Sequence, residues 1–422
     1  MMARSYRITT LGCRVNRADS ISMEREFAGI GYRKADPGEV PDVWVVNTCA
    51  VTAEGMRKSR KAVRRCAQSG SNIIVTGCAP ELEPETFERT KGVHAVVKNP
   101  EKSELVAIAS ELEGRSDKPV VWRCDELVRV PVKVQDGCGR FCTYCVVPYV
   151  RGKPESRALP EIIEDVRELR DAGAGEVVIC GIDLGSYRDA AGGAGLDVLV
   201  EKVIENAGEM WVRLSSIELS DVDDRLLEMM NEENALCRYI HVPLQSGDEV
   251  VLSDMGRNYS PQWFRRRVGE IRDAVPGAGI STDVMVGFPT EGKEAFDSTR
   301  SLMEDIGFSR VHVFRYSPRP GTEAVTLGDT IDPAVKNMRA GELRRVALES
   351  AARFHRDMVG RIILVLVEGP MESEAGYVFG RAENFAGIVI KGGLELVGKK
   401  LPVRVTGSGP RWLYGGPAEA EV

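Results

Sequence analysis

Three cysteines stand close together in the stretch Val134 to Gly152, which reads VQDGCGRFCTYCVVPYVRG. Cys138, Cys142 and Cys145 have the spacing C-x3-C-x2-C, which fits half of a zinc site, a disulfide or an iron–sulfur cluster. Structural zinc usually takes four ligands from paired hooks, and no histidine lies close by. Short thiolate spacings within one loop are typical of iron–sulfur clusters. Three cysteines would leave one iron of a four-iron cluster open for a substrate or cofactor.

A second set of three cysteines ends the apolar runs YRITTLGC, VWVVNTC and NIIVTGC. These are Cys13, Cys49 and Cys78, and helical segments separate them, the first from about Asp19 to Ile30. Buried strands followed by helices predict a parallel α/β sheet. Because ligands sit at the carboxyl ends of such strands, we expect the three cysteines to meet at one edge.

The composition predicts a soluble globular protein of two or three domains, with 422 residues, 43% apolar and 28% charged. The N-terminus has no apolar stretch of signal-peptide length, and the run Ile362 to Val367 is far shorter than a membrane span. We therefore expect a cytoplasmic protein with no membrane partner. In that compartment, ten cysteines point to metal or redox chemistry rather than to disulfides.

The net charge of −7 taken alone argues against nucleic-acid binding, but the charge is uneven. The segment RKSRKAVRR contains six basic residues and no acidic one. On a helix, Arg57, Lys61, Arg64 and Arg65 would share one side. A solvated helix face is the plainer interpretation, whereas a reactive site nearby would favour phosphate binding.

Repeated strand and helix segments predict a full or partial (β/α) barrel over 123–355. Short strands with glycine-rich turns then predict a small antiparallel barrel over 356–422. GRSDKPVVW reads as the linker that closes an N-terminal domain, 1–122. Several polar residues should gather at the carboxyl ends of the central strands: Asp183, Ser216, Glu218, Gln245, Asp283 and Arg315.

The loop CGRFCTYC resembles the cysteine loop of radical S-adenosylmethionine (SAM) enzymes, including the aromatic Tyr144. The whole chain resembles the methylthiotransferase family within that group. TLGCRVN, VVNTCAVT and VTGCAP match the family's N-terminal module, and LSSIE, TDVMVGFPTE and YSPRPGT match its radical domain. The tail resembles the family's small β-barrel, the TRAM domain, which binds RNA or substrate.

LGCRVN and GIDLGSY are most similar to the branch that modifies N6-threonylcarbamoyladenosine at position 37 of tRNA. Arg14 and Asp183 depart from the lysine and histidine that many members of this branch have. The branches that act on isopentenyladenosine of tRNA or on a ribosomal protein are the alternatives within the family.

The resemblance implies that Cys138, Cys142 and Cys145 hold a [4Fe–4S] cluster whose open iron binds SAM as the radical source. Cys13, Cys49 and Cys78 would hold a second [4Fe–4S] cluster, with a second SAM as methyl donor. The six cysteines are therefore expected to be catalytic as well as metal ligands. Further contacts to the cofactor are expected from Tyr144, Gly181, Asp183, Ser216, Glu218 and Gln245.

The implied partners are the anticodon loop of tRNA, a sulfur donor, and a reducing electron donor such as flavodoxin or ferredoxin. Two interpretations of other classes stay open: an iron–sulfur carrier without chemistry of its own, and a zinc-stabilised RNA-binding protein. His241 could touch the cofactor or pack at a strand end, and Arg315 and Arg319 could bind phosphate or pair with acids. Four further cysteines are interpreted as core residues: Cys66, Cys124, Cys180 and Cys237.

Overall fold

The computed structural model describes residues 4–114, 120, 122, 127–372 and 374–418. The chain forms two compact units. The first comprises Met1–Asp125, Asp136–Glu155 and Ser317–Val325, and the second comprises Glu126–Gln135, Ser156–Tyr316 and Thr326–Val422. The cysteine loop after residue 136 therefore groups with the N-terminal residues. The predicted division into three domains, at residues 122 and 355, stays a prediction.

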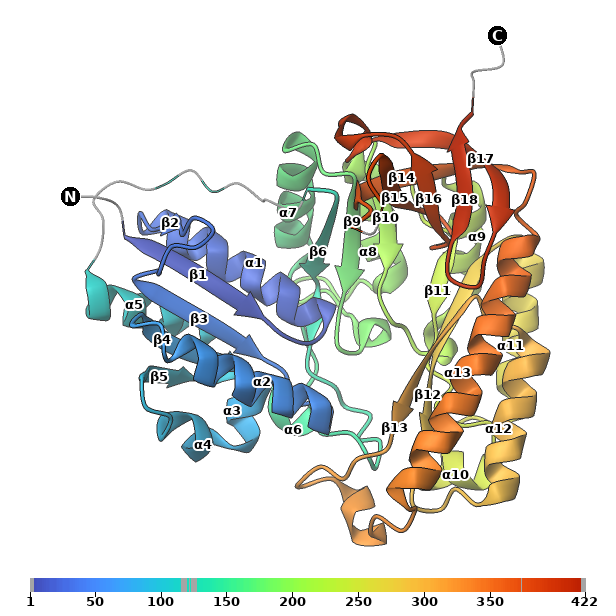
Figure 1. Ribbon diagram of the computed structural model, residues 1–422, viewed down its shortest axis with the longest axis horizontal. Coiled ribbons are helices and arrows are strands. Elements are labelled where there is room, and N and C mark those ends of the chain that lie inside the picture. Colours follow the sequence, from blue (N-terminus) through green and yellow to red (C-terminus); the bar gives the residue numbers. More distant parts are fainter. Residues whose placement is uncertain (1–3, 115–119, 121, 123–126, 373, 419–422) are drawn as a thin grey trace. The chain divides into compact units, whose positions relative to one another are not determined.

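The first unit is built on a parallel sheet with the strand order β2-β1-β3-β4-β5 (blue to cyan in Figure 1). Its strands are β1 (Ser5–Thr10), β2 (Arg33–Lys34), β3 (Val43–Thr48), β4 (Asn72–Gly77) and β5 (Val93–Val97). The central strands are apolar and buried on both faces, as in sheets covered by helices on two sides. The predicted parallel α/β sheet is confirmed.

Helices cover both faces of this sheet, and each face has its own core. Phe27 and Leu105 bring two helices against Val45 and Ile74, while Met56 and Val63 bring another against Val46. The helices of this unit are α1 (Arg14–Gly29), α2 (Ala53–Cys66), α3 (Cys78–Leu82), α4 (Pro84–Glu88), α5 (Leu105–Glu113) and α6 (Val147–Arg151), with a 3-10 helix η1 (Asn99–Glu104).

The predicted start of the first helix, about Asp19, is wrong, because α1 begins at Arg14 with Cys13 as its N-cap residue. The first turns of α1 bury the polar residues Asn16, Asp19 and Ser20. A search for apolar periodicity cannot detect a helix face that is buried by polar groups.

The second unit contains parallel strands in two sheets, with the orders β10-β9-β6 and β11-β12-β13. An isolated bridge between Ser216 and His241 extends the series from the first sheet to the second. This arrangement confirms the predicted partial (β/α) barrel. The strands are β6 (Arg129–Lys133), β9 (Glu176–Cys180), β10 (Trp211–Leu214), β11 (Tyr239–His241), β12 (Gly279–Val286) and β13 (Arg310–Arg315).

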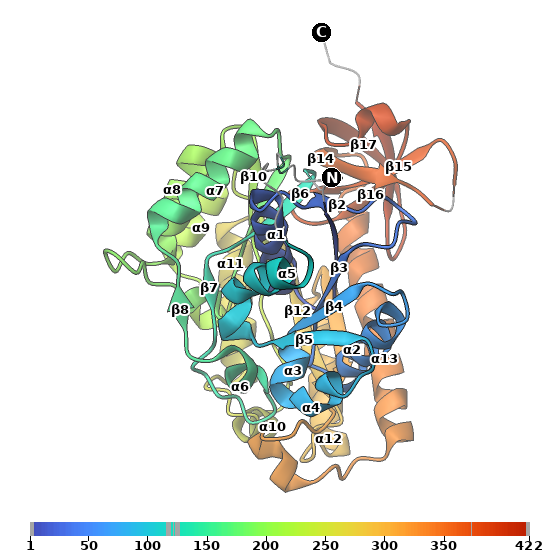
Figure 2. The ribbon, with the colours of Figure 1, turned by 90° about the vertical axis from the view of Figure 1, so that its left-hand side faces the viewer.

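Helices alternate with these strands along the chain (green to orange in Figures 1 and 2). They are α7 (Leu159–Asp171), α8 (Leu196–Ala207), α9 (Asp224–Glu232), α10 (Glu249–Asp254), α11 (Pro261–Ala274), α12 (Lys293–Ile306) and α13 (Pro333–Arg356). Across the described part of the chain, no helix has the length and apolar character needed to cross a membrane.

The tail of the second unit is a closed barrel with the strand order β14-β15-β16-β18-β17, which confirms the predicted small barrel. Every pairing is antiparallel except β16 with β18. Phe354 at the end of α13 and Met358 just beyond it pack against the barrel core. The strands are β14 (Ile362–Pro370), β15 (Tyr377–Ala382), β16 (Gly387–Lys391), β17 (Lys400–Ser408) and β18 (Leu413–Pro417).

Candidate functional site

The three N-terminal cysteines lie at the carboxyl ends of the adjacent parallel strands β1, β3 and β4. Cys13 caps α1, Cys49 directly follows β3, and Cys78 is the first residue of α3. Gly12 has a φ of +101°, and a Cβ there would lie 2.7 Å from the Cβ and 2.9 Å from the Sγ of Cys49. The glycine of LGC thus lets two of these cysteine segments approach each other closely.

Side chains from neighbouring elements fix the strand ends that carry these cysteines. The amide Nδ2 of Asn16 donates to the carbonyls of Leu11, at 2.7 Å, and Thr48, at 2.8 Å. The Ser59 hydroxyl accepts from the backbone N–H of Cys49 at 3.0 Å and donates to its carbonyl at 2.8 Å. The backbone of this edge is therefore positioned by the protein itself.

The loop with Cys138, Cys142 and Cys145 also belongs to the first unit, and all three thiols are half-buried. The backbone N–H of Cys138 donates to the carbonyl of Gly152 at 3.1 Å, which closes the loop at its base. The N–H of Cys145 donates to the carbonyl of Cys142, and the N–H of Arg140 lies 3.5 Å from the Sγ of Cys138. Half-buried Tyr144 lies within this loop.

Arg151 connects this loop segment with the N-terminal cysteines. Its Nε–H donates to the Sγ of Cys78 at 3.4 Å, and its Nη1 lies 3.0 Å from Asp19 and 2.9 Å from Asp136. Its Nη2 donates to the side-chain oxygen of Asn16. Burial would lower the pKa of Arg151, but the negative groups around it raise the pKa, so the buried guanidinium stays charged.

The chemistry of both cysteine sets fits iron–sulfur clusters, since all six side chains are cysteines outside any disulfide and thiolates are the usual cluster ligands. Burial raises the pKa of the Cys49 thiol to about 11, so metal binding there must displace a proton. The buried cation at Arg151 would balance part of the negative charge of a thiolate cluster. The assignment of the six cysteines as ligands stays a prediction.

The predicted cofactor contacts of the second unit follow the ends of its strands. Gly181 and Asp183 come after β9, and the backbone N–H of Asp183 donates to Gln135 at 2.9 Å. Ser216, after β10, is exposed, and Gln245 has a left-handed φ of 64°. Glu218 is half-buried and forms an ion pair with Arg257. Their contacts with a cofactor stay predictions.

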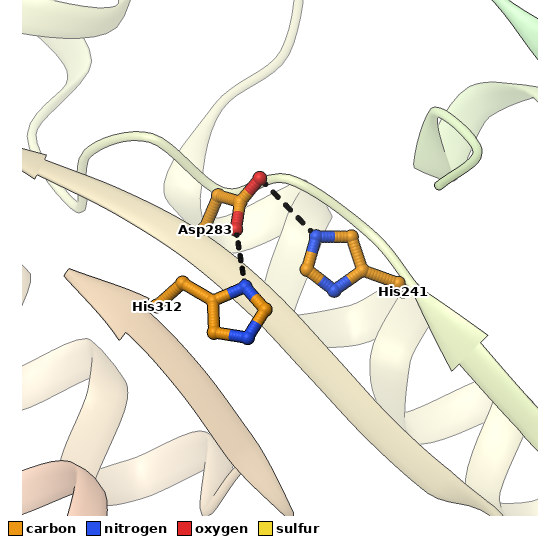
Figure 3. Close-up of side chains that lie close together, drawn as sticks. All are labelled: His241, Asp283 and His312. Carbon is orange, nitrogen blue, oxygen red and sulfur yellow. Dashed lines mark hydrogen bonds and ion pairs between the residues drawn. The ribbon is translucent and has the colours of Figure 1, made fainter. Parts of the chain in front are cut away.

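Figure 3 shows a hydrogen-bonded group of His241, Asp283 and His312 from β11, β12 and β13. Asp283 accepts from His241 Nε2 at 3.2 Å and from His312 Nδ1 at 3.1 Å. The network extends through the Ser281 hydroxyl, 2.7 Å from His241 Nδ1 and 2.6 Å from the Tyr239 hydroxyl. Burial would raise the pKa of Asp283, but the two histidine hydrogen bonds outweigh it and hold the pKa below its ordinary value.

The basic residues singled out from the sequence lie on the exposed side of α2, opposite the buried Met56 and Val63. Arg57 pairs with Glu54 at 2.6 Å, whereas Lys61 and Arg64 form no ion pair with any described residue. The same exposed side includes Arg65. This position suits a phosphate contact and equally a solvated face.

The other residues named from the sequence have separate environments. Cys66, Cys180 and Cys237 are buried, and Cys124 lies outside the described residues. Arg315 is exposed and contacts Asn337. Arg319 is buried in the first unit, and its Nε finds no hydrogen-bond partner among the described atoms.

Sequence reasoning missed Asn16, Asp19 and Arg151 as parts of the site. A signal was present, because Asn16 stands in TLGCRVN, one of the motifs of the family resemblance, and Arg151 stands in the stretch Val134 to Gly152 that contains the three-cysteine loop. Sequence spacing gives no hint that Arg151 contacts Cys78, since 73 residues separate them.

Comparisons with known proteins agree with this geometry. The model of the radical SAM superfamily matches residues 132–303, and that of the uncharacterized protein family UPF0004 matches residues 5–98. A solved structure of the radical SAM methyltransferase TsrM from Kitasatospora setae has a TM-score of 0.58, with 15% identity, and covers 76% of this chain and 77% of its own. The fold and the superfamily match define a radical SAM enzyme.

Curated relatives show which family of radical SAM enzymes this chain belongs to. Threonylcarbamoyladenosine tRNA methylthiotransferase MtaB from Bacillus subtilis is 31% identical over 95% of this chain and 93% of the relative. The protein of the same name from Aquifex aeolicus is 35% identical over 85% and 91%. A tRNA-2-methylthio-N(6)-dimethylallyladenosine synthase from Pelotomaculum thermopropionicum is 32% identical over 96% of each chain. The chain belongs to the radical SAM methylthiotransferase family.

Membership of this family makes the protein an enzyme, so the interpretations as an iron–sulfur carrier or a zinc-stabilised protein are not supported. It also implies one [4Fe–4S] cluster and SAM as cofactors. The loop with Cys138, Cys142 and Cys145 lies within the matched residues 132–303 and offers the thiolates for that cluster.

Proposed function

We propose that this enzyme converts N6-threonylcarbamoyladenosine at position 37 of tRNA to its 2-methylthio derivative. The observation that carries the proposal is the gathering of two three-cysteine sets in one compact unit, with Arg151 in contact with both segments. The threonylcarbamoyladenosine enzymes among the curated relatives, at 31% to 35% identity, support this substrate.

Cys138, Cys142 and Cys145 are proposed to hold the cluster that works with SAM, and Cys13, Cys49 and Cys78 a second [4Fe–4S] cluster. When bound, these groups supply the electron, the radical and the methylthio group that an unactivated aromatic C–H requires. The protein's own part is to position the substrate and the two thiol sets. Arg151 and Asn16 hold the segments of the two sets together, and orientation of this kind is a large part of barrier reduction.

A second candidate substrate is dimethylallyladenosine in tRNA. Enzymes with that activity are 30% to 32% identical to this chain over 90% or more of its length. The two candidates share the chemistry at carbon 2 of the adenine ring and differ in the group on N6.

The test is mass spectrometry of tRNA nucleosides from a bacterial host that makes both N6-modified adenosines and lacks its own methylthiotransferases. Expression of this chain is expected to produce the 2-methylthio derivative of threonylcarbamoyladenosine alone. The Cys138→Ala/Cys142→Ala/Cys145→Ala variant should produce none and serves as the control. The dimethylallyl derivative instead would support the second candidate, and no methylthio nucleoside from active, iron-loaded protein would overturn the proposal.

A further inference from the structure

A cavity of about 490 Å³ in the second unit has four arginines and four aromatic side chains in its lining. It lies where β13, the end of α13 and the loops of the tail barrel come together. Among its described lining residues there is no Asp or Glu. The residues that define its character are Arg310, Arg344, Arg381, Arg411, Phe385 and Trp412.

Three of the four arginines have no carboxylate to neutralise them. Arg310, Arg344 and Arg411 are exposed and form no ion pair with any residue that the structure describes. Arg345, the next residue of α13, is outside the lining and pairs with Glu349 at 2.8 Å. Guanidinium groups that converge without partners produce a positive potential, which favours an anion such as a phosphate.

The aromatic part of the lining is held in place by the fold. The ring of Trp412 lies against Gly387, where a Cβ would approach the ring to 2.6 Å, and it meets Phe379 edge to face at 6.1 Å. Phe385 stacks on Tyr239 at 4.5 Å, and the Arg381 guanidinium lies 4.5 Å from the Phe385 ring. Rings fixed by such contacts bind a flat ligand at a smaller cost in conformational entropy.

We propose that this cavity binds one nucleotide of a single-stranded RNA segment, with its phosphate at Arg310, Arg344 and Arg411 and its base against Trp412. A volume of about 490 Å³ is in the range of small-ligand sites, roughly 300–1,000 Å³. Stacked aromatic rings combined with a cationic groove are the usual way to bind single strands without reading sequence.

The inference rests on the proposed function, because it takes RNA as the substrate. It adds a contact site made by α13 and the tail barrel, which are remote in sequence from all six cysteines. The tail has a near-neutral charge, so only the gathering of its arginines with those of β13 and α13 reveals this site.

The test measures the dissociation constant of an unmodified tRNA for the cluster-loaded enzyme at several KCl concentrations. Arg344→Glu/Arg411→Glu should weaken binding about tenfold or more and lower the slope of log Kd against log[KCl] by about two. Trp412→Ala should weaken binding by roughly fivefold or more and leave the slope unchanged. Arg345→Glu, which makes the same charge change as Arg344→Glu alone and lies next to it on α13, should have little effect.

Wild-type affinity in both pocket variants would overturn the inference, provided that their iron content and thermal unfolding match those of the wild type. If 5′-AMP binds and the arginine variants weaken AMP but not tRNA, the cavity is a free-nucleotide site and the RNA assignment is wrong. If the wild type methylthiolates tRNA while the variants bind it normally, only this inference fails. If the wild type does not bind tRNA, the proposed function is wrong, and the inference that rests on it is wrong as well.

Discussion

The Nε–H of Arg151 lies 3.4 Å from the Sγ of Cys78 and donates a hydrogen bond to it, although 73 residues separate the two. Arg151 ends the helix that follows the C-x3-C-x2-C loop, and Cys78 begins the helix that follows β4. One buried cation therefore connects the segments of both cysteine sets. The neighbouring carboxylates of Asp19 and Asp136 keep that cation in place.

Replacing Arg151 by methionine should strongly destabilise the first unit. Asp19 would keep Lys102 but lose its buried partner, partly exposed Asp136 would lose it too, and breaking a buried pair costs up to about 3–5 kcal/mol of unfolding free energy. Urea unfolding without oxygen measures the change. Arg89→Met is the control, because the exposed Arg89–Glu85 pair should contribute at most about 1 kcal/mol. Equal losses in the two variants would contradict the structural role of Arg151.

Replacing Gly12 by alanine should disturb the N-terminal cysteine set and leave the other set intact. The new Cβ would lie 2.9 Å from the Sγ of Cys49, in addition to the strain of a φ of +101°. If Cys49 is a cluster ligand, iron content should fall by about half on anaerobic reconstitution.

Gly38→Ala controls for backbone strain alone. Gly38 also has a positive φ, of +86°, but nothing within 4 Å of the added methyl group. The variant is expected to lose some stability and to keep its iron. Full iron in Gly12→Ala would mean that the approach of Gly12 to Cys49 does not matter for cluster binding.

Asp283→Asn should lower stability by about 1–3 kcal/mol, because buried His241 and half-buried His312 would lose a charged acceptor. The folded-state pKa of Asp283 is lowered, so its carboxylate stabilises the protein fully above the unfolded pKa, about 3.9. The contribution is lost as the pH falls through the folded pKa. Urea unfolding should therefore show a smaller difference between wild type and variant at pH 3 than at pH 5. A difference that grew between pH 5 and pH 3 would contradict this sign.

Lys61→Glu/Arg64→Glu should weaken tRNA binding if the exposed side of α2 binds phosphates. Because two phosphate-binding cations would be removed, the slope of log Kd against log[KCl] should fall by about two. Arg89→Glu, at the exposed end of α4 in the same unit, is a single-charge control expected to have little effect. An unchanged affinity in the double variant would mean that these α2 residues form a solvated helix face and do not bind phosphate.

Much of the fold was predictable because buried apolar strands leave a strong pattern. Runs such as VWVVNTC predicted both a strand and the cysteine at its end, and parallel pairing then required neighbouring cysteines to share an edge. The start of α1 was not predictable, because Asn16 and Asp19 are polar side chains buried by hydrogen bonds and ion pairs. The contact of Arg151 with Cys78 depends on tertiary packing alone.

The cavity lined by four arginines was also not predictable from the sequence, because it forms only through tertiary packing. Arg310, Arg344, Arg381 and Arg411 come from four separate elements, and no single stretch of the sequence contains more than one of them. Local sequence shows charge only where it is continuous, as in RKSRKAVRR, and misses cations that gather only after folding.

The central claim is that the six cysteines form two independent three-cysteine cluster sites. Its most direct test is iron and acid-labile sulfide content after anaerobic reconstitution, in the wild type and in two variants. These are Cys138→Ala/Cys142→Ala/Cys145→Ala and Cys13→Ala/Cys49→Ala/Cys78→Ala. We predict about eight irons in the wild type and about four in each variant. About four irons in the wild type, unchanged by loss of Cys13, Cys49 and Cys78, would contradict the account.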